Sequence, residues 1–174
     1  SVAKVMQDAG YATVAAGKWQ VNDFRIEPEA MSKHGFDDYA MWTGYETGVP
    51  ESAERYWDPY IHTKKGSKTY PGEFGEDIFA EFLLNFIEQN KAQPWFAYYA
   101  MNLPHTPYTT TPHKPNVQGK MARHKAMVEY ADILLNKLTS ELEKMGEREN
   151  TIIIWTTDNG TNKSIVGRLN GRDV

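Results

Sequence analysis

Four polar side chains in this sequence follow shortly after apolar runs: Lys18, His105, Asp158 and Asn159. Asp and Asn offer hard oxygen ligands, the type that Ca²⁺ or Mg²⁺ prefers. Lysine supplies a fixed cation, and histidine transfers protons near neutral pH. Hydrolysis of an anionic ester moves negative charge onto oxygen atoms, so fixed cations and a divalent ion are the groups that this reaction needs.

The segment Thr151–Gly160, TIIIWTTDNG, is the most informative stretch. Its apolar residues Ile152–Trp155 do not alternate with polar ones, which is typical of a strand buried on both faces of a parallel sheet. We therefore predict a strand over Thr151–Thr157 that ends in an Asp-Asn-Gly sequence, and ligands of open α/β sheets bind at this end of the strands. Asp-Asn-Gly is also a common turn, so both interpretations remain open.

The other predicted elements alternate between helix and strand. Helices are expected over Ser1–Ala9, Glu76–Lys91 and Ala122–Met145, the last two from apolar residues at helical spacing. Strands are expected over Tyr11–Ala16 and Trp95–Met101 in addition to the one before Asp158. The stretch Val21–Gly75 shows little periodicity and is expected to be mostly loop.

This alternation predicts an α/β fold, a three-layer sandwich in which helices flank a mostly parallel sheet. Right-handed crossovers bring the carboxyl ends of parallel strands to one edge. Lys18, His105 and the Asp158–Asn159 pair are therefore expected around one crevice, which suits an anionic ester. No repeat or inner boundary is visible, so residues 1–174 are treated as a single domain.

Composition excludes several classes of function for this segment. A net charge of −4 gives no basic footprint for nucleic acid. No apolar run approaches ~18 residues, so no membrane span is expected. The absence of cysteine excludes disulfides and thiol catalysis within the 174 residues.

Four motifs occur in a fixed order: Gly10–Gln20 (GYATVAAGKWQ), His34–Asp37 (HGFD), Pro94–Pro107 (with PWFAYYA and PHTP) and Asp158–Gly160 (DNG). Together they resemble the sulfatase family of the alkaline-phosphatase superfamily, and the resemblance covers nearly the whole chain. It implies a partial sulfatase-like catalytic domain whose parent protein hydrolyses sulfate esters of a small molecule or a glycan. A periplasmic, secreted or lysosomal parent is also implied, although the sequence does not fix the compartment.

The resemblance assigns roles to single residues. Asp158 and Asn159 match the pair that binds Ca²⁺ in sulfatases. Lys18 matches the lysine that contacts the sulfate oxygens, and His105 matches a histidine that contacts the sulfate and assists the leaving group as a general acid. Gln20 stands where the family usually has a histidine beside the sulfate. It still donates and accepts hydrogen bonds but cannot transfer a proton at neutral pH.

Parts of the family's site have no counterpart in the sequence. The nucleophile of sulfatases lies in a C-x-P-x-R or S-x-P-x-R segment, whose Cys or Ser becomes formylglycine. That segment, two further Asp ligands and a later Lys are absent from the 174 residues. We therefore expect the nucleophile to lie outside this chain and the isolated chain to be inactive. Exposed sheet edges are expected to favour self-association.

Two other functions remain open. A phosphatase, phosphonate hydrolase or phosphoryl transferase of the same superfamily often has a Thr nucleophile and two transition metals. A non-catalytic scaffold that recognises sulfated glycans is favoured by Gln20. The aromatic residues between Tyr39 and Tyr70 either pack a long loop onto the sheet or form a wall for a sugar ring.

Overall fold

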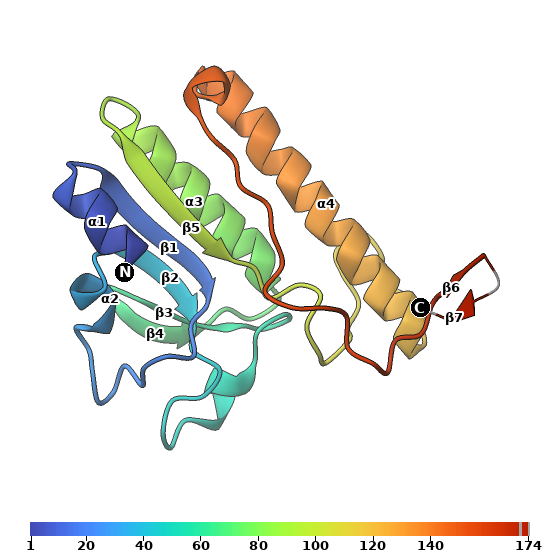
Figure 1. Ribbon diagram of the computed structural model, residues 1–174. Coiled ribbons are helices and arrows are strands. Elements are labelled where there is room, and N and C mark those ends of the chain that lie inside the picture. The colour runs from blue at the N-terminus through green and yellow to red at the C-terminus, as the bar shows by residue number, and fades with distance from the viewer. Residues whose placement is uncertain (171, 174) are drawn as a thin grey trace.

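The computed structural model describes residues 1–170, 172 and 173, and its main feature is a five-stranded sheet of order β4-β3-β2-β1-β5 (Figure 1). The strands are β1 (Ala12–Lys18), β2 (Asp38–Trp42), β3 (Tyr60–Thr63), β4 (Gly66–Thr69) and β5 (Trp95–Ala100). The α-helices are α1 (Val2–Asp8), α2 (Ala30–Lys33), α3 (Gly75–Asn90) and α4 (Lys120–Met145). Short 3₁₀ turns η1 (Pro50–Ala53) and η2 (Arg148–Asn150) and a small ribbon of β6 (Arg168–Leu169) and β7 (Arg172–Asp173) complete the chain.

The sheet is mixed. The central strand β1 pairs in parallel with β2 on one side and with β5 on the other. The β3–β4 hairpin continues the sheet in antiparallel pairing beyond β2. The three strands β2, β1 and β5 therefore end at one edge, and Lys18, the last residue of β1, lies opposite Trp42, the last residue of β2.

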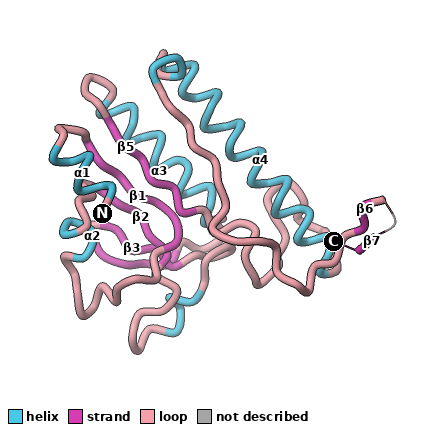
Figure 2. Tube along the Cα trace, in the orientation of Figure 1, coloured by secondary structure: helices cyan, strands magenta, loops and turns pink. Residues whose placement is uncertain are grey.

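Helices cover both faces of the sheet, which confirms the predicted α/β sandwich (Figure 2). On one face α1 and α2 pack against Ala15 and Met41. On the other face Phe79 and Leu83 of α3 pack against Val14. Each large apolar side chain removed from water in this way stabilises the fold by roughly 1.5–3 kcal/mol. Helix α4 lies outside α3 and packs against it.

The predicted helices and two of the predicted strands are confirmed to within a few residues. The stretch Val21–Gly75 is mostly irregular, as predicted, but it also contributes α2 and the strands β2, β3 and β4. β3 and β4 have four residues each, too few to show a periodic pattern. No helix in the described part of the chain combines the length and the apolar character that a membrane crossing requires.

The strand predicted over Thr151–Thr157 is wrong. This segment follows η2 as irregular chain, and Ile152 and Ile154 are 90% and 83% exposed. β5 is one of the two edge strands of the sheet and pairs only with β1 among the described strands. A run of apolar residues becomes a buried strand only when neighbouring strands take up its backbone hydrogen bonds, and residues 152–157 make no backbone hydrogen bond to any described strand.

Candidate active site at the carboxyl ends of β1, β2 and β5

The position of Lys18 depends on the glycine before it. Gly17 has a φ of +99°, and a Cβ atom added there would lie 2.1 Å from the carbonyl oxygen of Ala100 on β5. Only glycine allows so close an approach of two backbones. β1 and β5 are therefore held together at the residue pair directly before Lys18, which is half-buried at the sheet edge.

The end of β2 lies beside Lys18. The backbone N–H of Trp19 donates to the carbonyl oxygen of Trp42 at 2.7 Å, so pairing continues one residue past the end of β1. Gln20 is exposed, and its side-chain amide lies against Gly44. The β1–β2 pairing thus places Lys18 and Gln20 at the same edge of the sheet.

The segment after β5 is fixed by buried hydrogen bonds. The carboxylate of Glu76 accepts from the backbone N–H of Asn102 at 2.8 Å and from the hydroxyl of Tyr99. The hydroxyl of Tyr56 lies 2.8 Å from the carbonyl oxygen of Asn102 and 2.7 Å from that of His105. His105 itself is exposed, so its imidazole is accessible although the turn that carries it is fixed by buried hydrogen bonds.

Glu76 is fully buried in the first turn of α3. Burial raises the pKa of its carboxyl to about 7, and the hydrogen bonds from Tyr99 and Asn102 oppose this rise. Through its hydrogen bonds with Tyr99 and Asn102 the carboxyl ties α3 to the turn that leads to His105.

Arg55 is a member of the site that the sequence did not indicate. Its guanidinium carbon lies 4.0 Å from the centroid of the Trp42 ring, and Nη1 lies 3.2 Å from Nδ1 of His105. Desolvation lowers the pKa of Arg55 from its ordinary value. The aromatic stretch Tyr39–Tyr70 was the only signal near this residue. In the structure that stretch mainly supplies buried side chains such as Trp42 and Tyr56.

Several buried polar atoms at this edge have no hydrogen-bond partner among the described residues: Trp42 Nε1, Thr43 Oγ1, Arg55 Nε, and Asn102 Nδ2 and Oδ1. Buried polar atoms in proteins are nearly always hydrogen-bonded, so each exception calls for an explanation. All but one of these atoms can donate.

The structure does not bring the Asp158–Asn159 pair to this edge through a strand. Both side chains are exposed in the irregular segment after η2. Within residues 1–170, 172 and 173, no three His, Cys, Asp or Glu side chains are grouped as a metal site requires. The pair suits Ca²⁺ in chemical type, but Ca²⁺ takes about six to eight oxygens, so these residues supply two ligands of an incomplete set.

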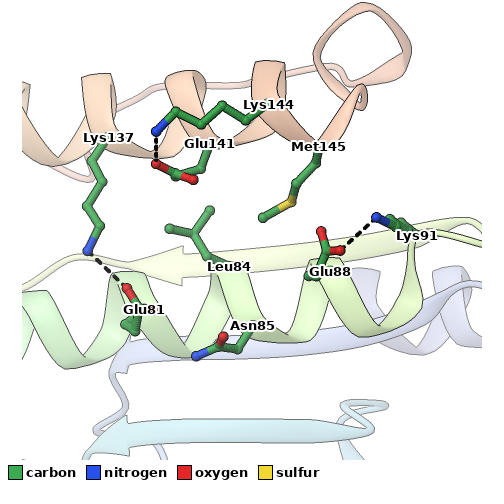
Figure 3. A pocket seen from close by; sticks show the side chains of 9 residues that line it. All are labelled: Glu81, Leu84, Asn85, Glu88, Lys91, Lys137, Glu141, Lys144 and Met145. Atoms are coloured by element: carbon green, nitrogen blue, oxygen red, sulfur yellow. Dashed lines mark hydrogen bonds and ion pairs between the residues drawn. The ribbon is translucent and has the colours of Figure 1, made fainter.

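A cleft of about 510 Å³ lies between α3 and α4 (Figure 3). Leu84 and Met145 point into it, and it is bordered by the ion pairs Lys137–Glu81 at 3.1 Å and Lys144–Glu141 at 2.6 Å. None of the predicted site residues lines it. The candidate site residues at the sheet edge therefore lie outside this cleft.

Comparison with known proteins identifies the family. The sulfatase family model matches residues 1–165. The chain belongs to the sulfatase family. Among curated sulfatases, it is 28% identical to an arylsulfatase of Hemicentrotus pulcherrimus over 94% of this chain, and 27% identical to an N-acetylgalactosamine-6-sulfatase of Canis lupus familiaris over 90%. It spans about a third (32%) of the length of each of these sulfatases.

Solved structures share the fold of this sulfatase chain. The crystal structure of Ps i-CgsB in complex with k-i-k-neocarrahexaose has a TM-score of 0.68 at 23% identity, covering 84% of this chain and 37% of that one. The structure of BT4656 in complex with D-glucosamine-2-N,6-O-disulfate has a TM-score of 0.64 at 16% identity, covering 86% and 47%. At these identities the similarity establishes the α/β fold of the sulfatase chain.

Proposed function

We propose that this chain carries the substrate-binding part of a sulfatase active site that hydrolyses sulfate esters of a glycan or a smaller sulfated molecule. The observation that carries this proposal is the parallel pairing of β1 and β5, since Lys18 ends the first strand and the hydrogen-bonded turn at His105 follows the second. The sugar ligands of Ps i-CgsB and BT4656 support a glycan as the substrate.

Each residue contributes through its charge or its hydrogen bonds. The ammonium of Lys18 stabilises the negative charge on the sulfate oxygens, which grows as the ester bond breaks. His105 contacts the sulfate group and assists the leaving oxygen. Gln20, held against Gly44, orients the ester as a hydrogen-bond partner but moves no proton. The nucleophile, proposed to be formylglycine, lies outside these 174 residues.

Asp158 and Asn159 are proposed to supply two oxygen ligands to a Ca²⁺ ion. Bound there, the ion would polarise the ester. The residues are adjacent in sequence and exposed, so both oxygens are accessible to an ion. The remaining ligands are proposed to come from residues outside the chain, because two oxygens do not complete the coordination of Ca²⁺.

The test is steady-state hydrolysis of an aryl sulfate by the full-length protein. Lys18→Ala is expected to lower kcat/KM by about 10²- to 10³-fold, since removal of one donor to a developing oxyanion has this effect. Lys163→Ala, an exposed lysine close to the Asp158–Asn159 pair, is the matched control and should retain the native rate. Equal rates for the two variants would remove Lys18 from the site.

The same assay separates the rival functions. Faster hydrolysis of phosphate esters than of sulfate esters by the native protein would favour the phosphoryl branch of the superfamily. Glycan binding without turnover would favour a scaffold, which is the alternative that Gln20 supports, because glutamine cannot replace a proton-transferring histidine.

A further inference from the structure

Arg55 is held in place from several sides. Its guanidinium stacks on Trp42 at 4.0 Å and lies 5.8 Å from the centroid of the Tyr56 ring. Gly75 packs against the backbone of Arg55, and a Cβ atom added to Gly75 would lie 2.1 Å from the carbonyl oxygen of Arg55. None of the ion pairs among the described residues includes Arg55. The side chain is therefore a fixed cation without a carboxylate partner.

The contact between Arg55 and His105 restricts the state of the imidazole. A guanidinium has five N–H donors, no acceptor, and does not lose its proton in proteins. At 3.2 Å from Nη1, Nδ1 of His105 forms a hydrogen bond only if it accepts. An imidazole that accepts at Nδ1 is neutral and carries its proton on Nε2.

A second contact at the same nitrogen requires the opposite state. Nδ1 of His105 lies 2.7 Å from the backbone carbonyl oxygen of Thr106, which only accepts. A hydrogen bond to this oxygen needs a proton on Nδ1, whereas the bond from Arg55 needs a lone pair there. The two bonds exclude each other, so Arg55 and Thr106 compete for the tautomer of one ring.

We propose that Arg55 is a positioning residue that holds His105 neutral with its proton on Nε2. A charge-assisted bond from a guanidinium is stronger than a bond between neutral groups. Without Arg55, the Thr106 carbonyl accepts a hydrogen bond from a protonated Nδ1, which leaves Nε2 as an acceptor.

The consequence for chemistry rests on the proposed role of His105 at the ester. A neutral imidazole with its proton on Nε2 is a fixed hydrogen-bond donor to an ester or sulfate oxygen, whereas a general acid must start as the cation. His105 therefore stabilises charge on oxygen through a hydrogen bond and keeps its proton. Arg55 acts on the reaction through His105 rather than by touching the reacting atoms.

The direct test is ¹⁵N NMR of the imidazole side chains in this 174-residue chain, with His105→Gln used to assign the signal. In the native chain His105 is expected to show the tautomer protonated at Nε2. In Arg55→Met, which keeps apolar contact with Trp42 but has no donor, the signal is expected to shift to the tautomer protonated at Nδ1. Arg25→Met, an exposed arginine that contacts Thr47, should leave His105 unchanged.

Two results would overturn the proposal. One is a native His105 that is protonated at Nδ1 or at both nitrogens near neutral pH. The other is an Arg55→Met chain with a native-like amide spectrum and an unchanged His105 signal. If Arg55→Met does not fold, the native spectrum and that of Arg55→Lys, which keeps a donor and should retain the Nε2 proton, decide the outcome.

Kinetics of the full-length protein separate this inference from the proposed function. Arg55→Met is expected to lower kcat by about 10- to 10²-fold with little change in KM, because the donor at Nε2 is lost. Because no proton leaves His105, the native protein and His105→Gln should show the same solvent isotope effect. A native effect clearly larger than that of His105→Gln would contradict the inference, whereas absence of any sulfatase turnover would contradict the proposed function and leave the NMR result standing.

Discussion

At the scale of single residues, the site depends on groups buried beneath it as much as on those exposed in it. Glu76 shows this, because its carboxyl is fully buried and accepts a hydrogen bond from the backbone N–H of Asn102. Lys18 and His105 were recognisable from the sequence because they follow apolar runs within family motifs. Glu76 and Arg55 were not, because an acid in the first turn of a helix and an arginine in an irregular stretch are ordinary on the surface.

The buried carboxyl of Glu76 makes the stability of the fold depend on pH. Burial raises its pKa to about 7 in the folded chain, against an ordinary value of 4.5. Between these values the folded chain binds more protons than the unfolded chain, so the free energy of unfolding falls as pH rises. The full change corresponds to about 3 kcal/mol between pH 4 and pH 8.

Urea unfolding at pH 5 and pH 8 checks this dependence. Glu76→Gln keeps an acceptor for the N–H of Asn102 and has no ionisable group. The free energy of unfolding of this variant should therefore fall much less between pH 5 and pH 8 than that of the native chain. Glu143→Gln, an exposed glutamate on α4, is the control and should keep the native dependence. A Glu76→Gln chain that destabilises with pH as the native chain does would contradict the prediction.

At the scale of elements, two of the sequence motifs form one structural unit. Asp37 of the HGFD motif accepts from the backbone N–H of Thr13 at 2.9 Å, from the Thr13 hydroxyl at 2.9 Å and from the Gln7 amide at 2.8 Å. Thr13 belongs to the first motif and to β1. These bonds connect the turn after α2 to the strand that ends at Lys18, so both motifs belong to the structure that supports this lysine.

Removing this fastening should cost stability. Asp37→Ala leaves the buried N–H of Thr13 without its acceptor, and we expect a loss of about 1–3 kcal/mol in the free energy of unfolding. Chemical denaturation measures it, with Asp132→Ala on the exposed face of α4 expected to change the free energy by less than about 0.5 kcal/mol. Comparable losses in both variants would show that Asp37 is only a surface charge.

The elements that were predicted correctly are those whose own residues show a clear apolar pattern. α3 and α4 carry long apolar stripes, and β1 and β5 are compact apolar runs. The segment Ile152–Trp155 has the same local character, but within the described part of the chain its backbone pairs with no strand. Apolar residues show that a segment favours burial, but the partner that buries it is decided by the rest of the fold.

At the scale of the whole molecule, the sheet has an open side at β5. Tyr98 on this strand is 45% exposed, and the apolar side chains of Ile152, Ile154 and Trp155 are also exposed. An edge strand with free N–H and C=O groups pairs readily with another chain, and exposed apolar side chains add to the association. We propose that a second copy of this chain occupies these surfaces at high concentration.

Light scattering of the purified chain over a concentration series tests this association. The native chain is expected to form dimers or larger species that dissociate on dilution. Ile154→Lys should shift the monomer range to at least about tenfold higher concentration, because a charge at the contact opposes burial. Ile26→Lys, at an isoleucine that is 73% exposed elsewhere, is the matched control. A native chain that stays monomeric would refute the proposal.

The close backbone contacts of Gly17 with Ala100 and of Gly75 with Arg55 affect how a mutational scan of this protein is interpreted. One added methyl group at either position collides with a backbone oxygen that fixes the place of Lys18 or Arg55. Such variants would lose turnover as completely as variants of the charged residues, although a glycine brings no functional group. Loss of activity in such a scan therefore identifies residues that set the backbone spacing as well as residues that take part in the reaction. Only substitutions that leave the chain folded identify the second group.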